Sequence, residues 1–314
     1  MVKYRIEMAK TTVYDLHNSL DSDTYLDKSE RNVQRVSNKL DDYIKEPNEE
    51  NIHDIRKAIR RLEASYRSLP SKKVRRKRVL REYAEYSKKL FSINSQIRDF
   101  DIIGEKLSNV GNLDQQDKLE SIKGSLFRQR RTKLNEAISF ALKLRKLRVP
   151  KLTKKIKISN KKSKKRFSKL IGKFGTRIEW NLPIVVNDSE KVTQLHELRK
   201  DCKKLRYLLE LLPDSNSKDQ TGEMDDYVSK LMEKLESVQD ILGIIHDYDT
   251  IMAYLRRRKG TGTKSTLVNS IIAQLKQERQ NKYEEFVKVT KADLSARTTN
   301  FFNRTANVVL GCHA

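Results

Sequence analysis

The stretch 195–209, LHELRKDCKKLRYLL, decides the fold because the chain contains a second copy of it. The second copy is 52–66, IHDIRKAIRRLEASY. When His53 is aligned with His196, a shift of 143 residues, basic residues fall at the same positions in both copies. The aligned pairs are Arg56 with Arg199, Lys57 with Lys200, Arg60 with Lys203, and Arg61 with Lys204. This recurrence indicates an internal duplication.

Both copies have the period of an amphipathic helix. At roughly 100° per residue, a histidine followed by basic residues three, four, seven and eight positions later forms one narrow stripe. Apolar residues occupy the opposite arc, namely Ile55, Ala58, Ile59, Leu62 and Tyr66 in the first copy and Leu198, Cys202, Leu205, Leu209 and Leu212 in the second. The polar face of each predicted helix is therefore almost entirely cationic, which suits a negatively charged ligand.

The composition favours an all-α protein with an anionic partner. Leu, Lys, Glu and Arg, which favour helix, are abundant, whereas the 314 residues include only 10 Gly and 5 Pro. The net charge of +25 is most simply relieved by a polyanion such as nucleic acid, inorganic polyphosphate or an anionic membrane. The two cysteines form no CxxC pair, which argues against a zinc ribbon or a disulfide scaffold.

The expected location is the cytoplasm. The start of the chain, MVKYRIEMAKTTVYDL, lacks the apolar core of a signal peptide. No stretch approaches the ~18–20 apolar residues that a membrane span requires. The low cysteine usage also fits a reducing compartment.

Breaking residues and charge divide the chain into segments. We expect helices over 24–45, 48–70, 72–107, 115–147, 189–212, 227–259 and 266–309. Residues 151–173 contain eleven Lys or Arg and no acid, which marks a seam. We therefore interpret 1–314 as one domain in which a basic linker, 151–187, joins an N-terminal half, 24–150, to a C-terminal half, 188–310.

A second repeat follows the first in the same order. The segment 98–101, Arg-Asp-Phe-Asp, matches 246–249, His-Asp-Tyr-Asp, at a shift of 148 residues. Each half thus has a cationic helix followed by a long helix that carries this acidic segment. Two ordered matches at nearly the same shift favour a duplicated helical unit of about 150 residues.

These motifs resemble the CHAD family, the conserved-histidine α-helical domain. The resemblance covers about 24–310 and implies two four-helix units, related by a pseudo-two-fold axis, around a basic central cavity that binds inorganic polyphosphate. The ligand-binding residues that it implies are His53, Arg56, Lys57, Arg60, Arg61, Arg98, His196, Arg199, Lys200, Lys203, Lys204, Arg206 and His246. The basic stripe of the first expected helix adds Arg31 and Arg35 as further candidate contacts.

The residue types suit phosphate. Arginine makes bidentate contacts to phosphate oxygens and lysine supplies a compact charge. A nearby anion favours the protonated form of histidine. Asp99, Asp101, Asp247 and Asp249 are expected to accept hydrogen bonds from the basic residues and to orient them. We expect no metal, no cofactor and no catalysis.

The two halves are not electrically equal. Glu63 stands where the second copy has Arg206, and Arg98 stands opposite His246. We therefore expect the second half to form the stronger wall of the cavity. Association with polyphosphate granules is a further expectation.

Two other functions compete with polyphosphate binding. The net charge and the lysine runs also fit RNA, because phosphate contacts dominate such affinity, although only 7% of residues are aromatic and no RNA-binding signature occurs. A metal-dependent phosphohydrolase is the second alternative, because His53-Asp54 and His246-Asp247 resemble His-Asp metal sites. Against it, Asp54 lies beside a cationic stripe that would repel a metal ion.

Overall fold

The structure is a computed structural model that describes residues 22–70, 72–109, 113–152, 160–212, 223–258 and 262–294. Within these residues the regular elements are helices and no strand occurs, which confirms the all-α prediction. The helices are α2 Ser22–Lys45, α3 Glu49–Ser68, α4 Lys72–Arg75, α5 Arg78–Ser108, α6 Leu113–Lys146, α7 Asn160–Asn187, α8 Val192–Leu209, α9 Glu223–Arg256 and α10 Gly262–Leu294. None of them is long and apolar enough to cross a membrane.

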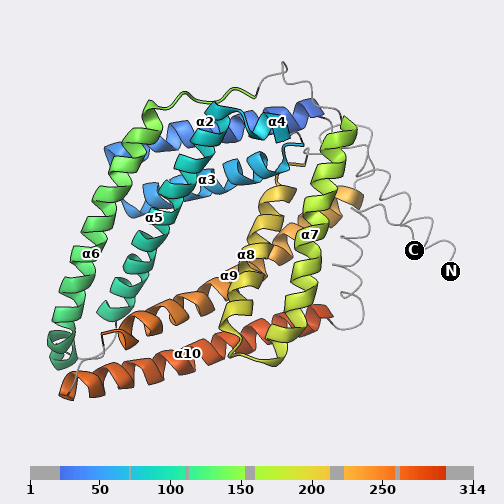
Figure 1. Ribbon diagram of the computed structural model, residues 1–314. Coiled ribbons are helices and arrows are strands. Elements are labelled where there is room, and N and C mark those ends of the chain that lie inside the picture. The colour runs from blue at the N-terminus through green and yellow to red at the C-terminus, as the bar shows by residue number, and fades with distance from the viewer. Residues whose placement is uncertain are drawn as a thin grey trace, which may run out of the picture.

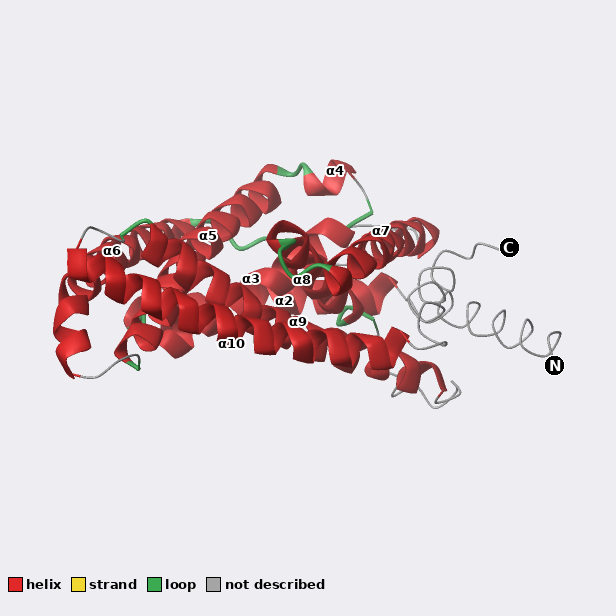
Figure 2. Cartoon of the chain, turned by 90° about the horizontal axis from the view of Figure 1, so that it is seen from below, coloured by secondary structure: helices red, strands yellow, loops and turns green. Residues whose placement is uncertain are grey.

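The long helices form pairs around a central space (Figure 1). Helices α3, α5, α8 and α9 lie on the inside, and each packs against an outer neighbour, which is α2, α6, α7 or α10 respectively. From below, α9 and α10 run side by side across the near side of the molecule (Figure 2). Contacts of α3 with α8 and of α5 with α9 join the two halves. The two helices that carry the cationic stripes therefore meet inside the fold.

Local sequence explains the entry into α3. The side chain of Asn48 accepts a hydrogen bond from the backbone N–H of Asn51 at 2.8 Å and caps the helix. Glu49 and Glu50 follow in the first turn, where negative charge stabilises the positive end of the helix dipole. The predicted start at Asn48 is therefore correct to within one residue.

The expected single helix over 72–107 is wrong at its basic start. Arg76 and Lys77 lie in a turn between α4 and α5. Contacts with the end of α3 stabilise the turn. The hydroxyl of Tyr66 donates to the carbonyl of Arg75 at 2.9 Å, and the Arg75 side chain donates to the carbonyl of Leu69. Consecutive like charges also disfavour a continuous helix in this block.

The segment 151–187, interpreted as a linker, instead contains the long helix α7. Its lysine runs conceal an apolar face at helical spacing, made of Phe167, Leu170, Ile171, Phe174, Ile178 and Leu182, each at most 7% exposed. Helix α7 packs on α8 as α2 packs on α3, so it supplies the fourth long helix of the C-terminal half. The rest of the division into halves stays a prediction.

Other boundaries moved by a few residues. Helix α8 begins at Val192, three residues later than expected, because Asp188 accepts a hydrogen bond from the backbone N–H of Glu190 at 2.8 Å and forms a turn there. Helix α9 begins and ends a few residues earlier than expected. Helix α10 is described to Leu294, and the remainder of the helix expected over 266–309 lies outside the described residues.

Two ion pairs at matching positions join the inner helices α5 and α9 to their outer neighbours. Arg130 of α6 donates to Asp101 of α5 at 2.5 Å, and Arg279 of α10 donates to Asp249 of α9 at 2.6 Å. Asp101 and Asp249 are 148 residues apart, the shift of the second sequence repeat. The matching contacts are those that a duplicated unit would produce, although the duplication itself stays a prediction.

Candidate anion-binding cavity

A cavity of about 910 Å³ lies between the inner helices α3, α5, α8 and α9. Twelve of the thirteen predicted ligand residues line it, namely His53, Arg56, Lys57, Arg60, Arg98, His196, Arg199, Lys200, Lys203, Lys204, Arg206 and His246. The helical period therefore brings side chains from four segments of the chain to one volume. Whether these residues contact a ligand stays a prediction.

Arg61 is the predicted ligand residue that the structure places elsewhere. Its Nε donates to Glu210 Oε2 at 2.7 Å, and its guanidinium lies 5.9 Å from the ring centroid of Tyr207. Glu210 follows α8 and competes for this arginine, so Arg61 joins α3 to α8. Arg31 and Arg35 are exposed on the outer helix α2 and do not line the cavity, so they are not contacts of this site.

The four predicted acidic residues divide into two pairs. Asp99 and Asp247 line the cavity. Asp101 and Asp249 do not line it, because a shift of two residues turns a helical side chain by roughly 200°, and they bind arginines of the outer helices. Burial raises the pKa of Asp99 to about 6. The charge of Arg56 opposes this rise, and the neighbouring Asp247 adds to it. The pKa of Asp247 is also raised by burial.

Several cavity cations lack a carboxylate partner. Within the described residues, no ion pair forms at Arg56, Lys57, Arg60, Arg199 or Lys203. Buried nitrogen atoms without a hydrogen-bond partner there are Nε of Arg56, Arg199 and Arg206 and Nδ1 of His196. Buried donors of this kind are costly unless an acceptor reaches them, and phosphate oxygens would supply that acceptor.

An aromatic residue that the sequence interpretation missed supports two of these cations. The guanidinium groups of Arg56 and Arg60 lie 5.6 and 5.0 Å from the ring centroid of Phe91, which also lines the cavity. Phe91 lies on α5 seven residues before Arg98, a helical spacing that places both on the same face. That spacing could have identified Phe91 as a cavity residue from the sequence alone.

Carboxylates balance the other cations at the edges of the cavity. Arg98 binds Glu49, and Arg206 binds Glu236. Arg67, another lining residue that the sequence interpretation missed, binds Glu63 at 2.6 Å. Because Glu236 balances Arg206, the predicted electrical advantage of the second half is smaller than the aligned sequences indicated.

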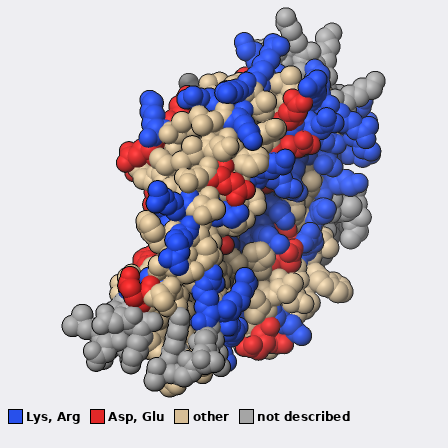
Figure 3. Space-filling view, turned by 60° about the vertical axis from the view of Figure 1, so that its left-hand side comes forward, with Lys and Arg blue, Asp and Glu red and all other residues tan. Residues whose placement is uncertain are grey.

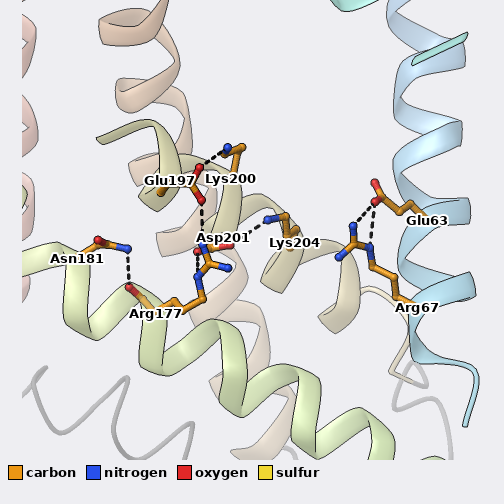
Figure 4. Close-up of polar contacts among 8 residues, drawn as sticks. All are labelled: Glu63, Arg67, Arg177, Asn181, Glu197, Lys200, Asp201 and Lys204. Atoms are coloured by element: carbon orange, nitrogen blue, oxygen red, sulfur yellow. Dashed lines mark hydrogen bonds and ion pairs between the residues drawn. The ribbon is translucent and has the colours of Figure 1, made fainter. Parts of the chain in front are cut away.

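Two carboxylates of α8, the buried Asp201 and the partly exposed Glu197, hold two of its lysines (Figure 4). Asp201 is fully buried and lies 2.8 Å from Arg177 Nε and 3.1 Å from Lys204 Nζ. Glu197 binds Arg177 at 2.9 Å and also binds Lys200. Helix α7 thus reaches the cavity through the carboxylates of α8.

The electrostatics of the cavity favour an anion. Ten Lys or Arg and three His line it, against six Asp or Glu. In the space-filling view, Lys and Arg gather along one side of the visible face and in a hollow near its middle (Figure 3). Burial, followed by Arg60 and Arg199, lowers the pKa of Lys203 to about 6. Burial, followed by Arg60, lowers that of Arg56 to about 10. Both shifts reflect burial of the charged group first and repulsion by neighbouring arginines second.

No group of three or more His, Cys, Asp or Glu in the described part of the chain is arranged to hold a metal ion. Asp54, which a His-Asp metal site would need, binds Lys39 Nζ at 2.8 Å. Lys39 lies on α2, so this pair is the counterpart of the Arg177–Glu197 pair in the other half.

Comparison with known proteins agrees with this architecture. The family model for the CHAD domain matches residues 30–256, and the chain belongs to that family. A crystal structure of the CHAD domain from the plant Ricinus communis is similar, with a TM-score of 0.55 and 13% sequence identity over 94% of this chain and 95% of that chain. At that identity the likeness shows the fold alone. A search of curated proteins found no match.

Proposed function

We propose that the cavity binds inorganic polyphosphate and does not change it chemically. The observation that carries the proposal is a group of basic residues that have no carboxylate partner among the described residues and that face one volume from α3 and α8. They are Arg56, Lys57, Arg60, Arg199 and Lys203. An extended polyanion supplies enough phosphate oxygens to contact basic residues of both helices at several points at once. The membership of the CHAD family and the implied ligand of that family support the same conclusion.

The aromatic residues of the cavity favour polyphosphate over RNA. Phe91 is covered by two guanidinium groups, and Phe174 and Tyr207 are each under 5% exposed. Proteins that bind single-stranded RNA usually stack bases on accessible aromatic rings. Polyphosphate has no bases and needs charge and N–H donors alone.

The test is a competition titration. Long-chain polyphosphate should displace labelled RNA, and RNA at equal phosphate concentration should fail to displace polyphosphate. The variant Arg199→Gln/Lys203→Gln should lose at least about ten-fold in polyphosphate affinity, because it removes two charge-assisted contacts. The matched control is Arg145→Gln/Lys146→Gln, which removes the same charge from exposed positions at the end of α6. Equal losses in both variants would contradict a cavity site.

The non-catalytic part of the proposal has its own test. The protein is incubated with polyphosphate and Mg²⁺ or Mn²⁺, and chain length is followed on a gel. Unchanged length is expected. Shortening that disappears in Asp247→Asn would overturn this part and favour a phosphohydrolase.

We propose the cytoplasm as the location, with association to polyphosphate granules. A fluorescent fusion should form foci that coincide with stained polyphosphate. Foci that persist unchanged after polyphosphate is depleted would contradict the granule association.

A further inference from the structure

One face of α7 is cationic in the first half of the helix and is not part of the cavity. The residues Lys162, Arg166, Lys169 and Lys173, here called the α7 stripe, fall within an arc of roughly 60° at helical spacing. The buried side chains of the same stretch lie on the adjoining arc and are Ser163, Phe167, Leu170, Ile171 and Phe174, and Gly172 is buried on the other side of the stripe. No acid occurs in α7 before Glu179. The stripe is therefore fixed in place by the packing of the helix.

The charge of the α7 stripe is not balanced within the described residues. Lys162, Lys169 and Lys173 are exposed, and none of them forms an ion pair there. Packing of α7 accounts for the apolar residues beside them but not for a row of like charges, which costs stability by self-repulsion. A polyanion lying along the helix would remove that cost.

The α7 stripe begins where the wall of the cavity ends. Arg166 Nε donates to the backbone carbonyl of Arg67 at 3.1 Å, and Arg67 lines the cavity. Phe174 of α7 also lines the cavity, and Lys204 Nζ lies 5.5 Å from its ring centroid. In the close-up, α7 passes beneath the space between Lys204 on α8 and Arg67 on α3 (Figure 4). The basic surface is thus continuous from the cavity onto α7.

We propose that the α7 stripe is a second binding surface, which takes the stretch of a long polyphosphate chain that leaves the cavity past Arg67. The inference rests on the proposed polyphosphate binding and adds a preference for long chains to it. From Lys162 to Lys173 the helix spans about 16 Å, so only a chain that extends well beyond the cavity reaches the whole stripe. A short oligomer bound in the cavity does not extend to α7 and gains nothing from the α7 stripe.

The experiment compares tripolyphosphate with long-chain polyphosphate on the full chain. In the variant Lys162→Gln/Lys169→Gln/Lys173→Gln, affinity for the long chain should fall about ten-fold, because three exposed charge contacts are removed and each contributes about two-fold. Affinity for tripolyphosphate should stay within about two-fold of the unaltered protein. The dependence of long-chain affinity on salt should also weaken. All three positions are exposed, so the fold is retained.

The matched control removes three exposed lysines from other helices, as Lys88→Gln/Lys146→Gln/Lys276→Gln. Unchanged long-chain affinity in the control supports the proposal. Equal losses in the control and the α7 variant would overturn it, since net charge alone would then explain both. Equal losses for tripolyphosphate and the long chain in the α7 variant would also overturn it. If the unaltered protein bound neither compound, polyphosphate binding itself would fail, an outcome distinct from failure of the α7 surface.

Discussion

The imidazole rings of His196 and His246 lie 4.5 Å apart between centroids, with their planes at 39°. His196 belongs to α8 and His246 to α9, so the contact joins two inner helices in the wall of the cavity. Burial, followed by the charge of Arg199, lowers the pKa of His246 to about 3. Burial, followed by Lys200, also lowers the pKa of His196. Without an anion, both rings are therefore neutral near pH 7.

The histidine pair predicts that polyphosphate binds more tightly as pH falls. Bound phosphates stabilise the imidazolium form and raise both pKa values, so the complex takes up protons at a pH between the free and the bound pKa. Affinity should increase as pH falls from near the ordinary histidine pKa of about 6.5 toward about 3, the pKa of His246 without an anion, and His246→Gln should reduce that increase. The measurement is the dissociation constant for long-chain polyphosphate, whose few end groups contribute little titration of their own. An identical pH dependence in the variant would show that His246 takes no part.

We expect Lys203 to take up a proton when polyphosphate binds, and this uptake can be measured separately from affinity. Its pKa of about 6, set by burial and then by Arg60 and Arg199, leaves it largely neutral at pH 7 without an anion. When polyphosphate binds, Lys203 should become charged again, and the complex should take up about one proton from solution. Lys203→Arg keeps the cation but stays charged throughout, so binding should persist while the uptake falls. Calorimetry in two buffers of different ionisation enthalpy measures the uptake, and an undiminished uptake in the variant would assign the proton to another group.

Twelve of the residues that line the cavity could be named from the sequence, because they follow a helical repeat. His53 and His196 anchor two stripes whose register fixes which side chains point inward. Arg61 departs from this pattern because Glu210, far along the chain, takes its guanidinium. The helical period of residues 52–66 gives no sign of that contact. A competing partner from another helix can be recognised only after the helices are placed.

Helix α7 shows the opposite difficulty. A dense run of lysines is typical of a solvated linker, and it hid the apolar positions Phe167, Phe174 and Ile178. Those residues do follow a helical period, so the signal was present but weaker than the charge. Pro183, which lies inside α7, further weakened any prediction of a continuous helix.

We expect Asp201 to stabilise the fold, a role that the aligned residue of the first half does not have. It is fully buried beside Arg177 and Lys204, whereas the aligned position in α3 is Ala58. Asp201→Ala should lower the free energy of unfolding by about 2–3 kcal/mol, less than for a wholly buried pair because both cations are partly exposed. Urea denaturation measures the loss. Asp54→Ala is the control and should cost less than about 1 kcal/mol, because the Asp54 side chain is 31% exposed whereas that of Asp201 is fully buried. Equal costs would mean that burial of Asp201 is not what matters.

We expect cavity cations without a carboxylate partner, such as Arg60, to contribute more to binding than paired ones, such as Arg206. Arg206 binds Glu236, so part of its charge is already balanced, and a phosphate must compete with that carboxylate. Arg60 has no carboxylate partner among the described residues and lies against Phe91 at 5.0 Å, ready to face an anion. Arg60→Gln should therefore weaken polyphosphate binding about ten-fold or more, and Arg206→Gln by less than about three-fold. Glu236→Gln provides the complementary control, since freeing Arg206 should strengthen binding. A larger loss at Arg206 than at Arg60 would restore the expectation, drawn from the aligned sequences, that the second half forms the stronger wall.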